Sequence, residues 1–171
     1  MFDRFCVVTR MSSVLVLAFS AALAVAQSPG NTSLNAQLLV AARQSDLDAV
    51  QRALANGAAA DSRNRLGKTV LLIAAEKGDE AMAQAALRAG ADVDLASVAG
   101  VTPLMAASYG GHLDLARRLL DAGARTNPVD RLHKPAIVYA AGQGHTAVVR
   151  LLLDRGVPLD AAYDSQLTAL M

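Results

Sequence analysis

Apolar positions along the chain follow the period of a helix rather than that of a strand. Within residues 113–121, four apolar residues are paired at i, i+4 spacing, and charged residues occupy much of the opposite side. This spacing places the apolar side chains on one helical stripe, formed by Leu115, Ala116, Leu119 and Leu120. Gly123 follows two residues later, where a left-handed residue commonly ends a helix. The pattern therefore predicts a helix over 113–121.

A shorter apolar block precedes this helix and carries its own start and stop signals. Thr102 can cap a helix through its hydroxyl, and Pro103 suits the first turn, where its missing N–H costs nothing. Residues 110 and 111 are both glycine and break the block. We predict a first helix over 103–109. The small side chains at 106 and 107 would let a neighbouring helix approach closely.

The same two-helix pattern recurs at a constant interval of 33 residues. Four segments match, namely "AQLLVAARQSD" (36–46), "TVLLIAAEKGD" (69–79), "TPLMAASYGGH" (102–112) and "PAIVYAAGQGH" (135–145). The glycines that follow the second helices keep the same interval, at Gly57, Gly90, Gly123 and Gly156. A catalytic loop need occur only once, so this repetition indicates a structural module.

The 33-residue interval, with Thr-Pro-Leu near the start of a unit, resembles the ankyrin repeat. The resemblance implies an all-α solenoid of stacked helix-turn-helix units with extended loops between them. The repeat domain would cover residues 36–171, with units at about 36–61, 62–94, 95–127 and 128–160 and a partial unit at 161–171.

Departures from the family pattern fall at the start of each unit. Met105 stands where the family has His, and Ala36 and Pro135 replace Thr. We therefore expect most of the side-chain hydrogen bonds of this motif to be absent, and stability to depend more on apolar packing.

The first 26 residues have a different character. Arg4 and Arg10 precede an uncharged run over 14–26, which ends in the small-residue pattern Ala24-Val25-Ala26. This arrangement is typical of a secretory signal peptide, and we expect cleavage after Ala26. The alternative is a retained membrane anchor, although a membrane span needs about 20 apolar residues. Residues 27–35 are rich in turn formers and predict a flexible lead-in.

Charge and cysteine content narrow the class of protein further. The full chain has 16 Lys and Arg against 15 Asp and Glu. Loss of residues 1–26 removes two arginines and one aspartate, which leaves 14 of each sign. This balance argues against a nucleic-acid binder. Cys6 is the only cysteine and precedes the apolar run, so a cleaved protein would have neither disulfides nor a lipid-bearing cysteine.

Catalytic and ligand-binding motifs are absent from the sequence. It contains no G-x-S-x-G, H-E-x-x-H or P-loop pattern. His112, His133 and His145 do not have zinc-ligand spacing, and Gly111-His112 and Gly144-His145 fall at the joint between two helices. We expect no enzyme activity, cofactor or metal, and a structural role for the two Gly-His pairs.

The family resemblance implies that a protein partner binds the loop tips and first-helix surfaces. The residues that vary there while the frame repeats are Arg65, Leu66, Lys68, Lys77, Val98, Tyr109, Arg131, Leu132, Lys134 and Gln143. Arg65-Leu66 and Arg131-Leu132 occupy the same phase two units apart. Their leucines are either exposed contact residues or side chains that pack inward.

The sequence therefore predicts an exported scaffold for protein–protein interaction, periplasmic or secreted, that binds no nucleic acid and, once cleaved, no membrane. The alternative is an accessory or stabilising factor for a periplasmic enzyme, such as one that handles peroxide. The chain ends inside a fifth unit, with apolar Leu167, Leu170 and Met171. A terminal repeat normally presents a polar outer face, so we expect a gene product truncated at its carboxyl end; the alternative is a native protein that is longer.

Overall fold

The computed structural model describes residues 30–158, and within them the chain forms eight helices and no strand. The helices are paired in sequence: α2 (Gly30–Gln44) with α3 (Leu47–Ala55), α4 (Val70–Lys77) with α5 (Glu80–Arg88), α6 (Pro103–Gly110) with α7 (Leu113–Asp121), and α8 (Ala136–Gly142) with α9 (Thr146–Asp154). The all-α repeat solenoid expected from the sequence is confirmed.

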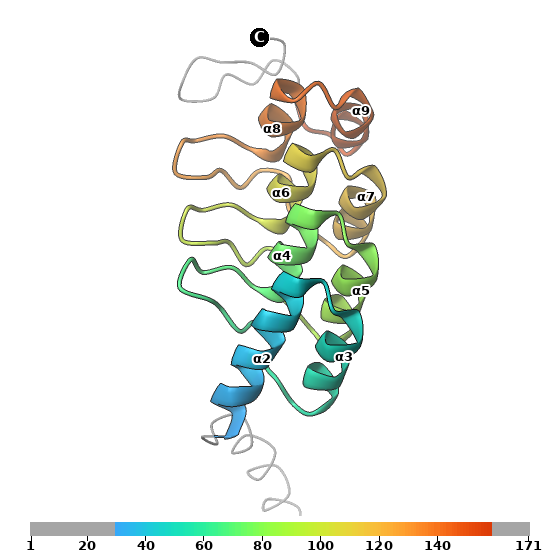
Figure 1. Ribbon diagram of the computed structural model, residues 1–171. Coiled ribbons are helices and arrows are strands. Elements are labelled where there is room, and N and C mark those ends of the chain that lie inside the picture. The colour runs from blue at the N-terminus through green and yellow to red at the C-terminus, as the bar shows by residue number, and fades with distance from the viewer. Residues whose placement is uncertain (1–29, 159–171) are drawn as a thin grey trace, which may run out of the picture.

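The pairs stack so that each kind of helix forms its own row (Figure 1). The first helices of the pairs, α2, α4, α6 and α8, lie side by side in an inner row, and α3, α5, α7 and α9 form an outer row. The loops between units project from the inner row to one side. One face of the molecule is therefore built from loop tips and first helices.

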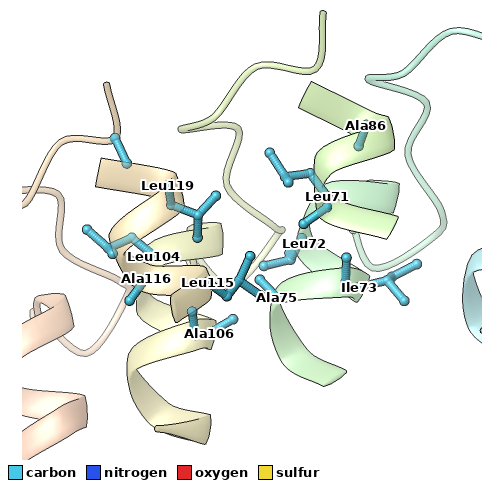
Figure 2. Close-up of a cluster of buried hydrophobic side chains, with 14 of the residues drawn as sticks. Leu71, Leu72, Ile73, Ala75, Ala86, Leu104, Ala106, Leu115, Ala116 and Leu119 are labelled. Atoms are coloured by element: carbon cyan, nitrogen blue, oxygen red, sulfur yellow. The ribbon is translucent and has the colours of Figure 1, made fainter. Parts of the chain in front are cut away.

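The core lies between the two rows of helices. In α4, residues 70–75 are all buried, and in α6 residues 103–108 are all buried, because these helices have neighbours on nearly every side. The outer helix α7 buries only the stripe predicted from its spacing, formed by Leu115, Ala116, Leu119 and Leu120. Figure 2 shows this cluster, with Leu119 and Leu115 of α7 lying beside Leu104 of α6.

Helix ends follow the local signals in the sequence. Helix α7 has the predicted bounds, and α6 begins at Pro103 as expected but continues one residue further, through Gly110. Gly111 then takes a left-handed conformation with φ of 70°, and Gly123 does so with φ of 95°. Both glycines therefore hold backbone conformations that other residues resist.

Caps at the start of the first helices vary between units. The hydroxyl of Thr69 accepts a hydrogen bond from the Leu72 N–H at 3.2 Å, and that of Thr102 accepts from the Met105 N–H at 3.3 Å. Pro135 provides no side-chain cap for α8. The fourth unit has Pro135 in place of the threonine and therefore lacks this hydrogen bond, whereas the second and third units have it.

The prediction of a flexible lead-in over 27–35 is wrong for residues 30–35, which form the first turns of α2. Tertiary contacts outweigh the turn propensity of this segment. Leu34 packs partly against the core, and the Asn35 Oδ1 accepts a hydrogen bond from the Ala59 N–H at 2.8 Å. The predicted signal peptide, the partial fifth unit and the apolar carboxyl end lie outside the described residues.

Ion pairs connect neighbouring units on the outer side of the stack. Arg118 contacts Glu80 at 3.2 Å, and Arg155 contacts Asp121 at 2.7 Å. Exposed pairs of this kind contribute at most about 1 kcal/mol each. The stack therefore depends chiefly on its buried alanine and leucine side chains.

Candidate functional site

Three loop tips, residues 62–68, 95–101 and 128–134, form what we call the loop-tip face. Each tip is a tight turn organised by a polar side chain at the same repeat position: Asn64, Ser97 and Asp130. The Asn64 Oδ1 accepts from the main-chain N–H groups of residues 66 and 68 at 2.9 and 3.0 Å. The Asp130 Oδ1 accepts from those of residues 132 and 134 at 2.9 and 2.8 Å. The backbone of the tips is thereby fixed.

Neighbouring tips are also joined to each other. The Val98 N–H donates to the Leu66 carbonyl oxygen at 3.0 Å, and the Arg131 N–H donates to the Ala99 carbonyl oxygen at 3.1 Å. The Arg63 guanidinium adds a bond to the Ala96 carbonyl oxygen at 2.5 Å. The three tips therefore form one continuous surface, visible as the row of loops in Figure 1.

Each tip has a large apolar residue that points outward. Leu66 is 62% exposed, Val98 51% and Leu132 64%. This answers the question left open by the sequence, because the leucines do not pack inward. A row of large apolar side chains held in solvent by a rigid backbone is a feature of surfaces that contact another molecule.

The loop-tip face is also basic. Its residues include five cations, Arg63, Arg65, Lys68, Arg131 and Lys134, and a single carboxylate, that of Asp130. The Asp130 side chain is buried and saturated with hydrogen bonds. The Lys68 ammonium pairs with Glu76 of α4 at 2.6 Å. No carboxylate in residues 30–158 pairs with Arg65, Arg131 or Lys134.

A cavity of about 420 Å³ opens beside the tips, between the first helices of three units. Its walls are Glu76 of α4, Met105, Ala106 and Tyr109 of α6, Tyr139 of α8 and Val101 of the adjoining loop. The cavity exists because Ala106 is small, whereas the same repeat position holds Ile73 in the preceding unit and Tyr139 in the following one. The sequence prediction missed this cavity, although a comparison of this position across units would have indicated it.

The two tyrosines of the cavity are fixed against each other. Their rings meet edge to face, with centroids 6.0 Å apart and an interplanar angle of 82°. The Tyr139 hydroxyl donates to the Asp130 Oδ2 at 2.5 Å. Burial, this hydrogen bond and the Asp130 charge raise the pKa of Tyr139 to about 12. Asp130 thus connects the third loop tip to a wall of the cavity.

The predicted contact residues do not all share this surface. Seven of them belong to the loop-tip face, namely Arg65, Leu66, Lys68, Val98, Arg131, Leu132 and Lys134, and Tyr109 lines the cavity. Gln143 is exposed at the end of α8. The Lys77 ammonium donates to the Ser45 Oγ at 2.9 Å and to the carbonyl oxygens of Ala42 and Arg43. Lys77 therefore ties α4 to the end of α2.

Two of the three histidines pack against glycines of the helix ends. The His112 ring covers Gly78 and Gly110, and the His145 ring covers Gly111. Among residues 30–158, no three potential metal ligands cluster. Within the same range, no helix has the length and apolar character needed to cross a bilayer.

Comparison with known proteins agrees with this architecture. A family model described as ankyrin repeats, in three copies, matches residues 38–130, which is more than half of the chain. A search of curated proteins finds no match.

Proposed function

The chain belongs to the ankyrin-repeat family, and from this premise we propose that it is an exported scaffold that binds another protein through its loop-tip face. Ankyrin repeats generally mediate protein–protein interaction and are typically not enzymes. A solenoid of this kind contacts partners over an extended surface, because each unit adds to the same face.

One observation supports the choice of the loop-tip face above all others. Leu66, Val98 and Leu132 are exposed in a row, beside arginines without a carboxylate partner in the described residues. Interfaces are enriched in arginine and in apolar or aromatic anchors, and such anchors often enter a pocket on the partner or accept one. Here the apolar row, the cations and a tyrosine-lined cavity adjoin one another.

Export is part of the proposal and rests on the sequence of residues 1–26. The basic start, the short apolar run and Ala24-Val25-Ala26 match the requirements of a signal peptidase. Intact-mass measurement of the exported protein tests this. We expect a species that begins at Gln27, and a main species that still begins at Met1 would exclude cleavage.

Site-specific photo-crosslinking tests the binding face. We would place p-benzoylphenylalanine at Leu66 or Leu132, and at Ala81 or Ala147 as matched controls. The two alanines are exposed on the outer helices α5 and α9. Each variant is irradiated in a periplasmic extract of the source cells.

We expect a discrete crosslinked protein from the loop-tip positions and not from the outer positions. Equal labelling from both sets would reject the loop-tip face as the binding surface. A stoichiometric complex with a single enzyme would instead assign the chain an accessory role towards that enzyme.

A further inference from the structure

The charge of the loop-tip face differs from that of the whole chain. The full chain has a net charge of only +1, yet the three tips contain five cations against one buried carboxylate. Arg65 and Arg131 are exposed and occupy the same position in the first and third tips. A partner that covers this face must compensate these charges, since an unpaired cation buried at an interface is costly.

The cavity is flanked by the same basic residues. Glu76 is the only carboxylate among the described residues that line it, and it forms an ion pair with Lys68. On the other side, the Asp130 carboxylate accepts hydrogen bonds from the Tyr139 hydroxyl and from the main-chain N–H of Lys134. Of the two carboxylates that adjoin the cavity, Glu76 is therefore paired with a cation and Asp130 is saturated with hydrogen bonds. The interior remains suited to an apolar group.

The dimensions of the cavity fit an aromatic or large aliphatic side chain. Its volume is about 420 Å³, whereas a cavity of about 150 Å³ already accommodates benzene. Tyr109 is 55% exposed and offers a ring at the entrance. An aromatic side chain entering there can meet both tyrosines edge to face or offset, the arrangements that aromatic pairs prefer.

The spacing of the cations indicates an extended ligand. Neighbouring helices pack about 8–10 Å apart, so Arg65 and Arg131, two units apart, are separated by roughly 20 Å. An extended chain rises about 3.3 Å per residue. Carboxylates about six residues apart along an extended segment could therefore meet both arginines.

We propose that the partner presents an extended acidic segment whose carboxylates contact Arg65, Arg131 and Lys134 and whose aromatic side chain enters the Tyr109–Tyr139 cavity. This inference rests on the proposed function and specifies the chemistry of the partner. A protein segment is favoured over a nucleic acid because the free cations are few and alternate with exposed Leu66, Val98 and Leu132. A phosphate backbone would leave those side chains without an apolar contact.

The test uses three fluorescein-labelled peptides of about 12 residues, long enough to span the tips in extended form. They share a central Phe and the same leucines, and differ only in whether the remaining positions are Asp and Glu, Asn and Gln, or Lys. Labelled oligothymidine serves as a fourth probe. Binding to the purified chain is measured by fluorescence anisotropy at about 0.05 M and about 0.3 M salt, where screening differs strongly.

We expect the acidic peptide to bind at least tenfold tighter than the other three probes at low salt, and to weaken as salt rises. Arg65→Glu with Arg131→Glu should lower its affinity at least tenfold and favour the Lys peptide. Arg88→Glu with Arg150→Glu is the matched control, since both arginines are exposed on outer helices. Tyr109→Ala should weaken a peptide with Phe but not one with Ala in its place.

Each other outcome overturns the inference. Equal binding of the neutral peptide, tighter binding of oligothymidine, absence of binding by all probes, or loss of binding in the Arg88 and Arg150 control would all do so. Failure here is distinguishable from failure of the proposed function. If loop-tip crosslinking captures a protein while the acidic peptide does not bind, the face is correct and its assigned chemistry is wrong.

Discussion

The Nε2 of His145 lies 3.0 Å from the main-chain oxygen of Tyr109, 36 residues earlier in the chain. The same imidazole covers Gly111, where an added Cβ would lie 2.5 Å from the His145 Nδ1. His112 covers Gly78 in the same way one unit earlier. The glycine of one unit and the histidine of the next thus form a joint between units, which gives a structural reason for the recurrence of the Gly-His pairs.

This joint predicts a difference between two glycines with the same backbone conformation. Gly111 has φ of 70° and Gly144 has φ of 76°, but an added Cβ at Gly144 meets no atom of the described residues within 4 Å. Gly144→Ala should therefore cost only the left-handed strain, about 1–2 kcal/mol. Gly111→Ala should cost about 1–3 kcal/mol more, because the His145 ring must move. Urea denaturation measures both free energies of unfolding.

A double variant provides the control for this prediction. His145→Ala in the Gly111→Ala background removes the clash, so the two changes should be non-additive. If Gly111→Ala and Gly144→Ala were equally destabilising, the contact between the ring and Gly111 would not exist in solution.

The buried stripe of α7 predicts the effect of truncating its most enclosed leucine. Leu119 is fully buried, so Leu119→Ala should cost about 2–5 kcal/mol through lost burial and a residual cavity. Leu132→Ala is the matched control, because Leu132 is 64% exposed and exposed substitutions usually change stability by about 0.5 kcal/mol or less. An unchanged urea midpoint for Leu119→Ala would contradict the assignment of α7 to the core.

Much of the fold was predictable because its determinants are local and repeated. The i, i+4 stripe and the glycine at 123 define α7 without reference to any other segment, and the 33-residue interval then transfers that prediction to the other units. The prediction of a flexible lead-in failed over residues 30–35 for the opposite reason. These residues adopt a helix through Leu34 and Asn35, whose contacts with the rest of the stack no local pattern reveals.

The hydrogen bond between Asp130 and Tyr139 predicts a dependence of stability on pH. Burial, the bond and the charge raise the pKa of Tyr139 to about 12, above the value of about 10 for a free tyrosine. The folded state then binds the phenol proton more tightly than the unfolded state. The resulting stability is fully present below about pH 10 and is lost as pH rises towards 12.

Thermal melts between about pH 9 and about pH 12 measure this effect, because this range includes the pKa of about 10 of a free tyrosine. Tyr139→Phe is the control. The wild type should lose more stability over this range than Tyr139→Phe. Asp130→Asn should lower the pKa of Tyr139, seen as phenolate absorbance appearing at lower pH. Identical pH profiles for wild type and Tyr139→Phe would mean that folding does not raise the pKa of Tyr139.

The candidate site was predictable only in part. Some of its residues are placed by the repeat itself, whereas others depend on contacts between units. Loop-tip positions such as Arg131 and Leu132 follow from the repeat phase, because their variation within a fixed frame is visible in one sequence. Lys77 has the same variability, yet its ammonium contacts the end of α2. The cavity needs side chains from three units, and it depends on Ala106 being smaller than its counterparts.

The last prediction separates folding from binding at the loop-tip face. Arg131→Glu with Leu132→Asp alters two exposed side chains while leaving their backbone bonds available, since the Arg131 N–H donates to Ala99 and the Leu132 N–H to Asp130. Helicity by circular dichroism and the melting temperature should therefore remain nearly unchanged, with a stability change of about 0.5 kcal/mol or less.

The same double variant should lose at least about tenfold in capture of the partner, equivalent to about 1.4 kcal/mol, because it reverses one charge and removes one apolar anchor. Capture is compared by crosslinking in periplasmic extract at equal amounts of folded protein, with Leu119→Ala as the opposite control. That variant should melt earlier yet capture the partner normally while folded, because Leu119 is buried away from the surface. An unchanged capture pattern in the double variant would reject Arg131 and Leu132 as contacts, and a collapsed melting curve would show that Leu132 supports the loop rather than the partner.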